Sequence, residues 1–161
     1  MSAPSAQQIW KTLARRSFAV LSHVTPAGEP RSSGVVYTVS GDRMFVVVAK
    51  DSWKARHIAA HQLVSVTVPV RRGGLLSLVA PIPPATVSFP AVALVHSGEI
   101  LAELPRLAAV VPPERRASCT VLELRPTGHY VTYGIDVPLL RMRDPARARA
   151  RVAVRDSVRE G

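Results

Sequence analysis

Cysteine is almost absent from this chain of 161 residues. Cys119 is the single cysteine, so an intrachain disulfide is impossible and a reducing compartment is the natural setting. It lies in a segment with the pattern of a strand, where a lone cysteine is more often a small core residue than a nucleophile. Residues 1–17 also lack the apolar run of a signal peptide. Together these absences predict a cytoplasmic protein.

Several motifs that mark common enzyme classes are missing as well. The chain has no G-x-S-x-G, no glycine-rich Rossmann fingerprint and no P-loop, so the hydrolase and nucleotide-triphosphatase classes have no support. Its five histidines are scattered. His57 and His61 have the i, i+4 spacing that can bind a metal on a helix, but the sequence offers no third ligand. We predict no metal site.

Acidic residues are scarce, with 11 against 21 lysines and arginines, which gives a net charge of +10. Seven arginines fall between Arg141 and Arg159, and the acids Asp144, Asp156 and Glu160 reduce the excess over 141–160 to +4. A basic surface invites a nucleic-acid partner. However, no zinc-finger spacing, helix-turn-helix or aromatic RNA-binding motif accompanies these arginines. We therefore expect a solvated basic tail at about 144–161 and regard nucleic acid as an unlikely partner.

The length and an apolar content of 47% predict one packed domain over residues 1–161. Expected helices cover the N-terminal segment capped by Ser5, residues 53–61, residues 101–111 and a short turn from Asp144–Pro145. Alternating apolar residues and turn signals predict strands at 18–24, 31–39, 44–49, 64–70, 85–95, 120–125 and 129–133. Six or seven short strands with a few short helices indicate a mainly β, antiparallel barrel.

One long segment carries no formal charge, from Gly73 to Gly98, provided that His96 is neutral. Its length would allow a bilayer crossing, but prolines 81, 83, 84 and 90 would break a helix repeatedly. We predict a proline-rich loop at 73–84 that leads into a buried strand. If the loop is exposed, it covers a ligand, seals a dimer or touches a membrane. We favour a pocket wall or dimer contact over membrane contact.

The segment from Gly28 to Ile58 predicts a phosphate site. Arg31 opens one expected strand, and the loop after the next strand brings Ser52, Lys54 and Arg56 to the start of a helix. Arginine offers a planar fork, lysine a point charge, and the helix start adds backbone donors and the favourable end of its dipole. Each residue alone would be explained by an exposed strand end or helix face. Their ordered combination favours a shared phosphate ligand.

The order of these elements resembles the flavin-binding split β-barrel proteins, the relatives of pyridoxamine 5′-phosphate oxidase and of the deazaflavin-dependent reductases. The likeness rests on G-x-P-R at Gly28 to Arg31, the hairpin after it, and the S-x-K-x-R that starts at Ser52. It is clearest over 18–70 and weaker over 119–151. The resemblance implies a homodimeric split barrel that binds FMN or a deazaflavin at the subunit interface. Such a protein transfers hydride between the flavin and a small organic substrate.

The resemblance also implies roles for individual residues. The family arginine that binds the flavin phosphate corresponds to Arg31, and the serine and lysine that hold the same phosphate correspond to Ser52 and Lys54. The residues expected beside or beneath the flavin ring are Ser32, Ser33, Gly34, Val47, Val48 and Ala49.

Two further candidates for cofactor binding come from the start of the helix. Lys54 and Arg56 resemble the K-x-R of deazaflavin-binding members, and Trp53 occupies a position that is often basic in the oxidase. A polar residue common near Val48 is missing. These departures weaken oxidase activity on pyridoxamine phosphate more than they weaken flavin binding.

No side chain is marked as a general acid or base, so we nominate cofactor ligands only. The alternative is a split barrel that holds a flavin, a haem or another apolar ligand without turnover, in contact with a membrane through Leu75 to Ile82.

Overall fold

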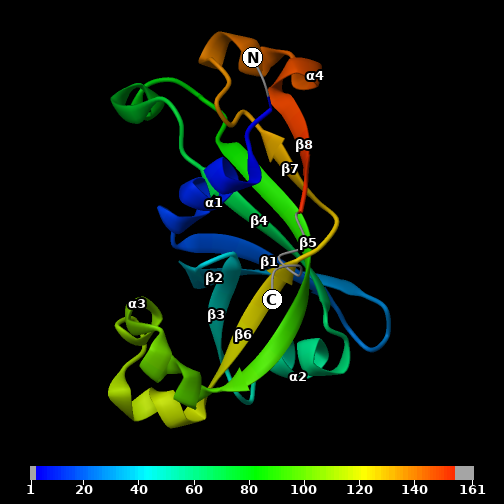
Figure 1. Cartoon of the computed structure of the whole chain (residues 1–161), viewed down its shortest axis with the longest axis vertical. Coiled ribbons are helices and arrows are strands. Elements are labelled where there is room, and N and C mark those ends of the chain that lie inside the picture. Colours follow the sequence, from blue (N-terminus) through cyan, green and yellow to red (C-terminus); the bar gives the residue numbers. More distant parts are fainter. Residues whose placement is uncertain (1–2, 155–161) are drawn as a thin grey trace, which may run out of the picture.

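A closed antiparallel barrel forms the centre of the computed structural model, which describes residues 3–154 (Figure 1). Its strands are β1 (Phe18–Val24), β2 (Pro30–Ser40), β3 (Arg43–Ala49), β4 (Leu63–Val70), β5 (Ala85–Ser97), β6 (Cys119–Pro126), β7 (His129–Tyr133) and β8 (Arg149–Ala153). Their order is β4-β1-β2-β3-β6-β5-β7-β8, and β4 also pairs with β5. Strands β1 to β6 therefore close a six-stranded barrel, while β7 and β8 extend it at one end. The predicted antiparallel barrel is confirmed.

Short helices decorate this barrel. They are α1 (Ala6–Ala14), α2 (Trp53–Ala60), α3 (Pro105–Ala108) and α4 (Pro145–Ala148), with 3₁₀ turns η1 (Gly74–Leu78), η2 (Gly98–Glu103), η3 (Pro113–Ser118) and η4 (Leu139–Arg143). As predicted, Ser5 caps α1, and it does so in a reciprocal pair with Gln8. Ile9 and Leu13 of α1 are fully buried in the main core, so this helix packs its apolar face on the barrel.

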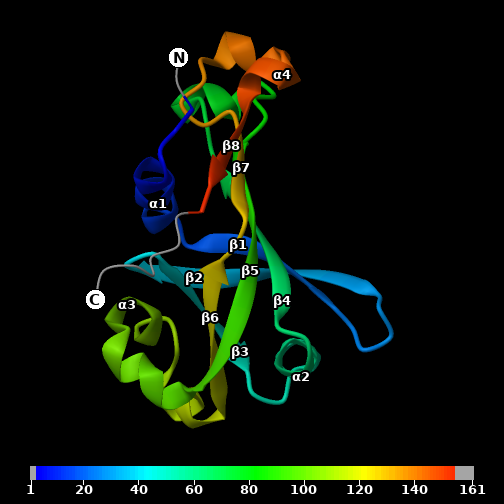
Figure 2. The same cartoon turned by 45° about the vertical axis from the view of Figure 1, so that its right-hand side comes forward.

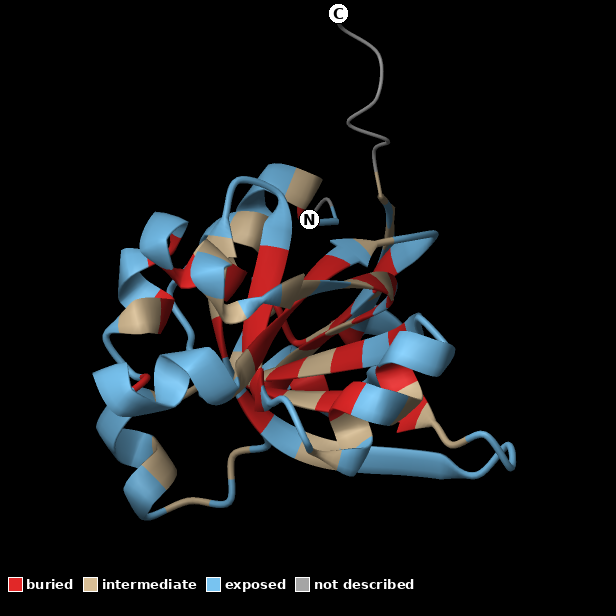
Figure 3. Ribbon diagram, turned by 90° about the horizontal axis from the view of Figure 1, so that it is seen from below, coloured by how far each residue is buried: buried red, intermediate tan, exposed pale blue. Residues whose placement is uncertain are grey.

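The barrel interior is filled by alternate residues of its strands, shown as buried positions in Figure 3. In β4, for example, Val64, Val66, Val68 and Val70 are all buried, while the residues between them are more exposed. This is the period of two that a strand with one core-facing side requires. The interior core also takes in α1 and α2.

A second apolar cluster lies outside the barrel. The segment from η2 to Val111, which follows α3, places Leu101, Leu107 and Val111 against Phe45 of β3 and Val121 of β6. In Figures 1 and 2 this segment lies at the same end of the molecule as α2. It forms one wall of the candidate site.

The expected single helix over 101–111 is wrong. Leu104 adopts φ −124° and ψ 69°, which ends η2, and Pro105 then opens α3. A residue that precedes proline is pushed out of the helical region, so Pro105 divides the segment in two.

The C-terminal part also differs from expectation. The short helix at Asp144–Pro145 is confirmed as α4, with Asp144 Oδ1 accepting from the Ala146 N–H at 3.1 Å. The strand β8, which pairs with β7, lies within the expected basic tail at 144–161 and was not predicted. The remainder of that tail, 155–161, lies outside the described residues.

Across residues 3–154, no helix is both long and apolar enough to span a bilayer.

Candidate functional site

The start of α2 is built by Ser52, which follows the turn at the end of β3. Its N–H donates to the Ala49 carbonyl at 3.0 Å, and its Oγ accepts from the Ala55 N–H at 3.1 Å. Ser52 therefore occupies the N-cap position of α2. The first N–H groups of a helix have no partner within the helix, so this end of α2 carries positive potential.

A cavity of about 370 Å³ opens beside this helix start. One side is the outer face of β2 and β3, the other is the segment at and after α3, and Ser52 with Lys54 lies at one end. Its lining residues are Gly34, Val35, Val36, Val47, Val48, Ala49, Ser52, Lys54, Leu107, Val110 and Val111. The walls are apolar and the polar groups gather at one end, so the cavity suits a flat apolar ligand with an anionic group at that end.

Six of the eleven residues proposed from the sequence line this cavity, namely Gly34, Val47, Val48, Ala49, Ser52 and Lys54. Gly34 has no side chain, so nothing projects from β2 into the cavity at this position. A Cβ atom there would lie 2.7 Å from the Phe18 ring, so a larger residue would have to displace that ring. Lys54 is half-buried, and this burial lowers the pKa of its ammonium group. A nearby anion would offset that desolvation.

Arg31 is not among the lining residues. Its guanidinium binds the Glu29 carboxylate at 2.6 Å, and both side chains are 58% exposed. An exposed pair of this kind is weak, so an anionic ligand can compete with Glu29 for the arginine. Arg31 also pairs across the sheet with His23 of β1, which places it on the side of the barrel where α2 packs.

The remaining four predicted residues, Ser32, Ser33, Trp53 and Arg56, do not line the cavity. Ser32 Oγ is 2.7 Å from Ser22 Oγ on the outer face. Ser33 Oγ is buried and has no hydrogen-bond partner among the described residues. Trp53 is exposed, and the Arg56 guanidinium lies 5.3 Å from its ring centre.

A histidine pair that the sequence did not predict lies next to this site. Nε2 of the buried His23 is 3.2 Å from Nδ1 of His57 on α2, and His23 Nδ1 has no partner among residues 3–154. Burial lowers the pKa of His23, and the neighbouring His57 lowers it further. The charges of Lys54 and Arg31 act in the same direction. Two cations therefore flank this pair, which favours an anion over a metal ion nearby.

The sequence also missed the α3 side of the cavity. Leu107, Val110 and Val111 have the apolar spacing of any packed helix, and nothing local indicates that they lie over β3. The His23–His57 contact likewise joins residues 34 positions apart, so it depends on barrel closure.

No protein-family model and no curated protein sequence matches the chain. Solved structures do match its fold. An F420 reductase is 17% identical, with a TM-score of 0.59 over 79% of this chain and 96% of that one. A heme-binding protein from Mycobacterium smegmatis is 21% identical, with a TM-score of 0.64 over 83% of this chain and 56% of that one, so our chain spans little more than half its length. HutZ, the heme storage protein from Vibrio cholerae, is 17% identical, with a TM-score of 0.60 over 77% of this chain and 91% of that one.

At these identities the likeness is one of fold. The chain has the split β-barrel fold of the flavin-binding proteins that its sequence resembles.

Proposed function

We propose that the protein is an oxidoreductase that binds FMN or a deazaflavin in the cavity between β2, β3 and α3 and acts on a small organic substrate. The observation that supports this most directly is that Ser52 and Lys54 share one cavity with Gly34 and with Val47 to Ala49. The sequence pattern predicts a phosphate ligand for the first two, and the family resemblance implies a flavin ring beside the others. The F420 reductase of similar fold adds support for a deazaflavin.

In this proposal each wall of the cavity has a separate task. Lys54 and the capped start of α2 hold the phosphate through charge-assisted hydrogen bonds. Arg31 also binds this phosphate, in place of its contact with the Glu29 carboxylate. Val47 and Ala49 support one face of the ring, and Val110 excludes water from the open side. The bound flavin supplies the hydride chemistry, while the protein binds and orients it.

A second candidate function is haem binding without turnover. Two proteins of similar fold carry heme binding or heme storage in their names, and His23 and His57 place two imidazoles next to the site. Absorption spectra of the loaded protein separate the candidates, because a flavin absorbs at about 450 nm, a deazaflavin at about 420 nm and a haem most strongly at about 400 nm.

The test is a titration of FMN and of a deazaflavin into the wild type, Lys54→Gln and Lys50→Gln. Loss of a charged hydrogen bond costs about 1.5–3 kcal/mol, so we expect Lys54→Gln to weaken binding of the preferred cofactor roughly 10- to 150-fold. Lys50 is exposed, does not line the cavity and serves as the matched control.

The pH dependence gives a second readout. The Lys54 charge is lost as pH rises through its lowered pKa, so wild-type affinity should fall in that range and the affinity of Lys54→Gln should not. Equal affinities in wild type and Lys54→Gln for both cofactors would contradict the proposed phosphate site. Uptake of haem alone would favour the second candidate.

A further inference from the structure

The loop that follows β4 projects apolar side chains into solvent. Gly73 and Gly74 both have positive φ, at 88° and 52°, and turn the chain into η1. Leu75 and Val79 are each 84% exposed, and Leu76 and Leu78 are also exposed. We refer to residues 75–79 as the apolar tip. Exposed apolar groups concentrated on one short turn mark an interaction surface more often than scattered ones do.

The apolar tip is internally ordered. The Leu76 N–H donates to the Gly73 carbonyl and the Ala80 N–H to the Leu76 carbonyl, each at 3.0 Å, and Ser77 Oγ donates to the Gly74 carbonyl at 2.7 Å. These polar groups are therefore already paired. Pairing of this kind lowers the cost of moving a backbone segment out of water.

Another exposed leucine, outside the apolar tip, lies at the same end of the molecule. Leu140 of η4 is 84% exposed. Arg72 joins the segment before the apolar tip to the segment before η4. Its guanidinium donates to the Gly134 carbonyl at 3.0 Å and to the Val137 carbonyl at 2.6 Å. Figures 1 and 2 show η1 and the segment around α4 at one end of the long axis, and α2 and α3 at the other.

Arginines are concentrated at the same end of the molecule as these leucines. Residues 71–84 and 134–151 together contain seven arginines and two aspartates. Arg147 pairs with Asp144 at 3.2 Å, and Asp136 is the other acid. Four of the arginines line a cavity of about 430 Å³ between α4, β8 and the residues before α1. A neighbouring cavity of about 350 Å³ is lined by Arg71 and Arg72 together with Lys11, Arg15 and Arg16 of the α1 end.

We propose that this end of the protein docks on a bilayer that contains anionic lipid. The apolar tip and Leu140 enter the region below the headgroups, and the surrounding arginines bind lipid phosphates. Buried apolar area and attraction to anionic lipid are the two contributions on which interfacial binding depends. This differs from the sequence-based preference for a pocket wall, because the tip is exposed at the end of the molecule opposite the cofactor cavity.

A second copy of the chain fits this surface less well. In a two-fold contact the same patch occurs on both sides, so two sets of arginines would face each other around the leucines. Like charges opposed in this way are destabilising. A bilayer with anionic lipid complements both the exposed leucines and the arginines of this surface. The proposal does not depend on the proposed cofactor.

The test is sedimentation of the full chain with vesicles of phosphatidylglycerol and phosphatidylcholine, and with vesicles of phosphatidylcholine alone, at about 0.15 M salt. We expect the wild type to sediment with the anionic vesicles and at least tenfold less with the neutral ones. Leu75→Ser combined with Val79→Ser should reduce binding at least tenfold. Leu63→Ser, at a residue of β4 that is 59% exposed, is the matched control and should bind as the wild type does.

Three results would overturn the proposal. The first is a wild type that stays in the supernatant, and the second is unchanged sedimentation of the double variant. The third is a double variant that loses lipid binding but, without lipid, also changes from dimer to monomer by light scattering or loses cofactor affinity. That result would assign the tip to a second copy or to a pocket wall. Thermal unfolding checks that the substitutions at exposed positions leave the fold intact.

Discussion

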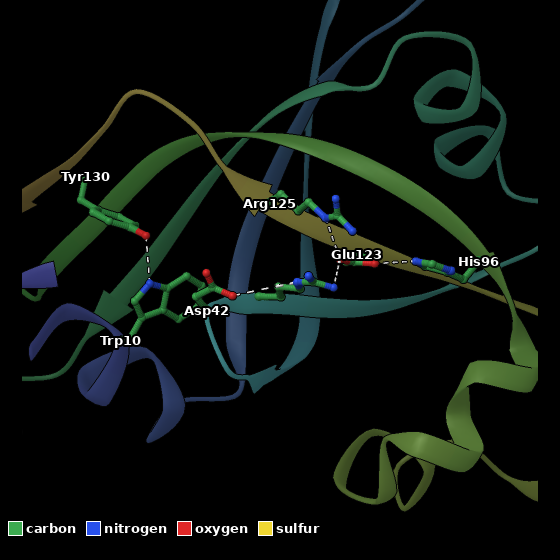
Figure 4. Close-up of polar contacts among 7 residues, drawn as sticks. Trp10, Asp42, His96, Glu123, Arg125 and Tyr130 are labelled. Atoms are coloured by element: carbon green, nitrogen blue, oxygen red, sulfur yellow. Dashed lines mark hydrogen bonds and ion pairs between the residues drawn. The ribbon is translucent and has the colours of Figure 1, made fainter. Parts of the chain in front are cut away.

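Replacement of Glu123 by glutamine should destabilise the barrel by about 2 kcal/mol at neutral pH. Glu123 lies on the outer face of β6, but its side chain is only 4% exposed because longer side chains cover it. Its carboxylate accepts from Arg125 Nε at 2.8 Å, from His96 Nε2 at 2.6 Å and from Arg43 at 3.0 Å. Figure 4 shows these contacts converging from β3, β5 and β6. One buried carboxylate thus ties three strands together.

The magnitude follows from the balance of these contacts. A hydrogen bond to a charged group contributes about 1.5–3 kcal/mol, and three such bonds would suggest more. However, the Arg43 and Arg125 side chains are about half exposed and regain water when the carboxylate is lost. Glutamine also keeps one acceptor oxygen and turns an amide toward a cation. A net loss of about 2 kcal/mol corresponds to a fall in Tm of roughly 4–8 °C for a chain of this size.

The pH dependence of the effect has a definite sign. Burial raises the pKa of the Glu123 carboxyl, but hydrogen bonds from Arg125 and His96 and the neighbouring arginine charges outweigh it, so the pKa lies below the ordinary value of a glutamate. A lowered folded-state pKa gives stability that is present above the unfolded-state pKa and is lost as pH falls through the folded-state value. The gap between wild type and Glu123→Gln should be constant above about pH 5.5 and shrink below about pH 4.5.

Urea denaturation across this pH range measures the effect, and Glu29→Gln is the matched control. Glu29 also contacts an arginine at 2.6 Å, but that pair is exposed, so its loss should cost below about 1 kcal/mol. Equal losses in the two variants, or a Glu123→Gln loss that does not change with pH, would refute the argument that burial gives this cluster its strength.

Two further predictions concern other parts of the molecule. The protein should be a two-fold dimer of about twice 17.4 kDa, because Val36 and its cross-strand partner Phe18 form an exposed apolar area next to Val110. Light scattering should find the Val36→Glu variant monomeric. A monomeric wild type would contradict this interface. Gly98→Ala should cost about 1–3 kcal/mol in urea denaturation, because its Cβ would clash with the Arg116 carbonyl oxygen. An unchanged midpoint would contradict this prediction.

The strands of the barrel were predictable because their signals are local. Alternation of valines in β4 and turn residues between β2 and β3 identify strands without knowledge of their partners. The strand β8 has the same alternation, with Arg149 and Arg151 exposed between less exposed neighbours. Its arginines suggested a solvated tail instead, because an edge strand with few apolar residues differs little from a basic tail in sequence.

The candidate site was predictable only in part, for a related reason. Ser52 and Lys54 follow from a helix-start pattern and Gly34 from the family resemblance, so their shared position needed no knowledge of distant contacts. The contact of Arg31 with Glu29 and the contact of His23 with His57 depend on side-chain geometry after the barrel closes. The apolar tip illustrates the same limit, since its sequence shows that it is uncharged but not whether it faces a pocket or solvent.

The proposed lipid-binding tip and the proposed cofactor cavity lie far enough apart for both to be occupied at the same time. Strand β5 runs from Ala85, near the apolar tip, to Ser97, which pairs with Thr120 at the α3 end. Thirteen residues of strand span about 40 Å, more than the depth to which an interfacial segment enters a bilayer. A protein docked through the tip therefore keeps the cofactor cavity in water. It follows that a substrate reaching this cavity arrives from the aqueous phase, and that a substrate confined to the hydrocarbon region is excluded by geometry.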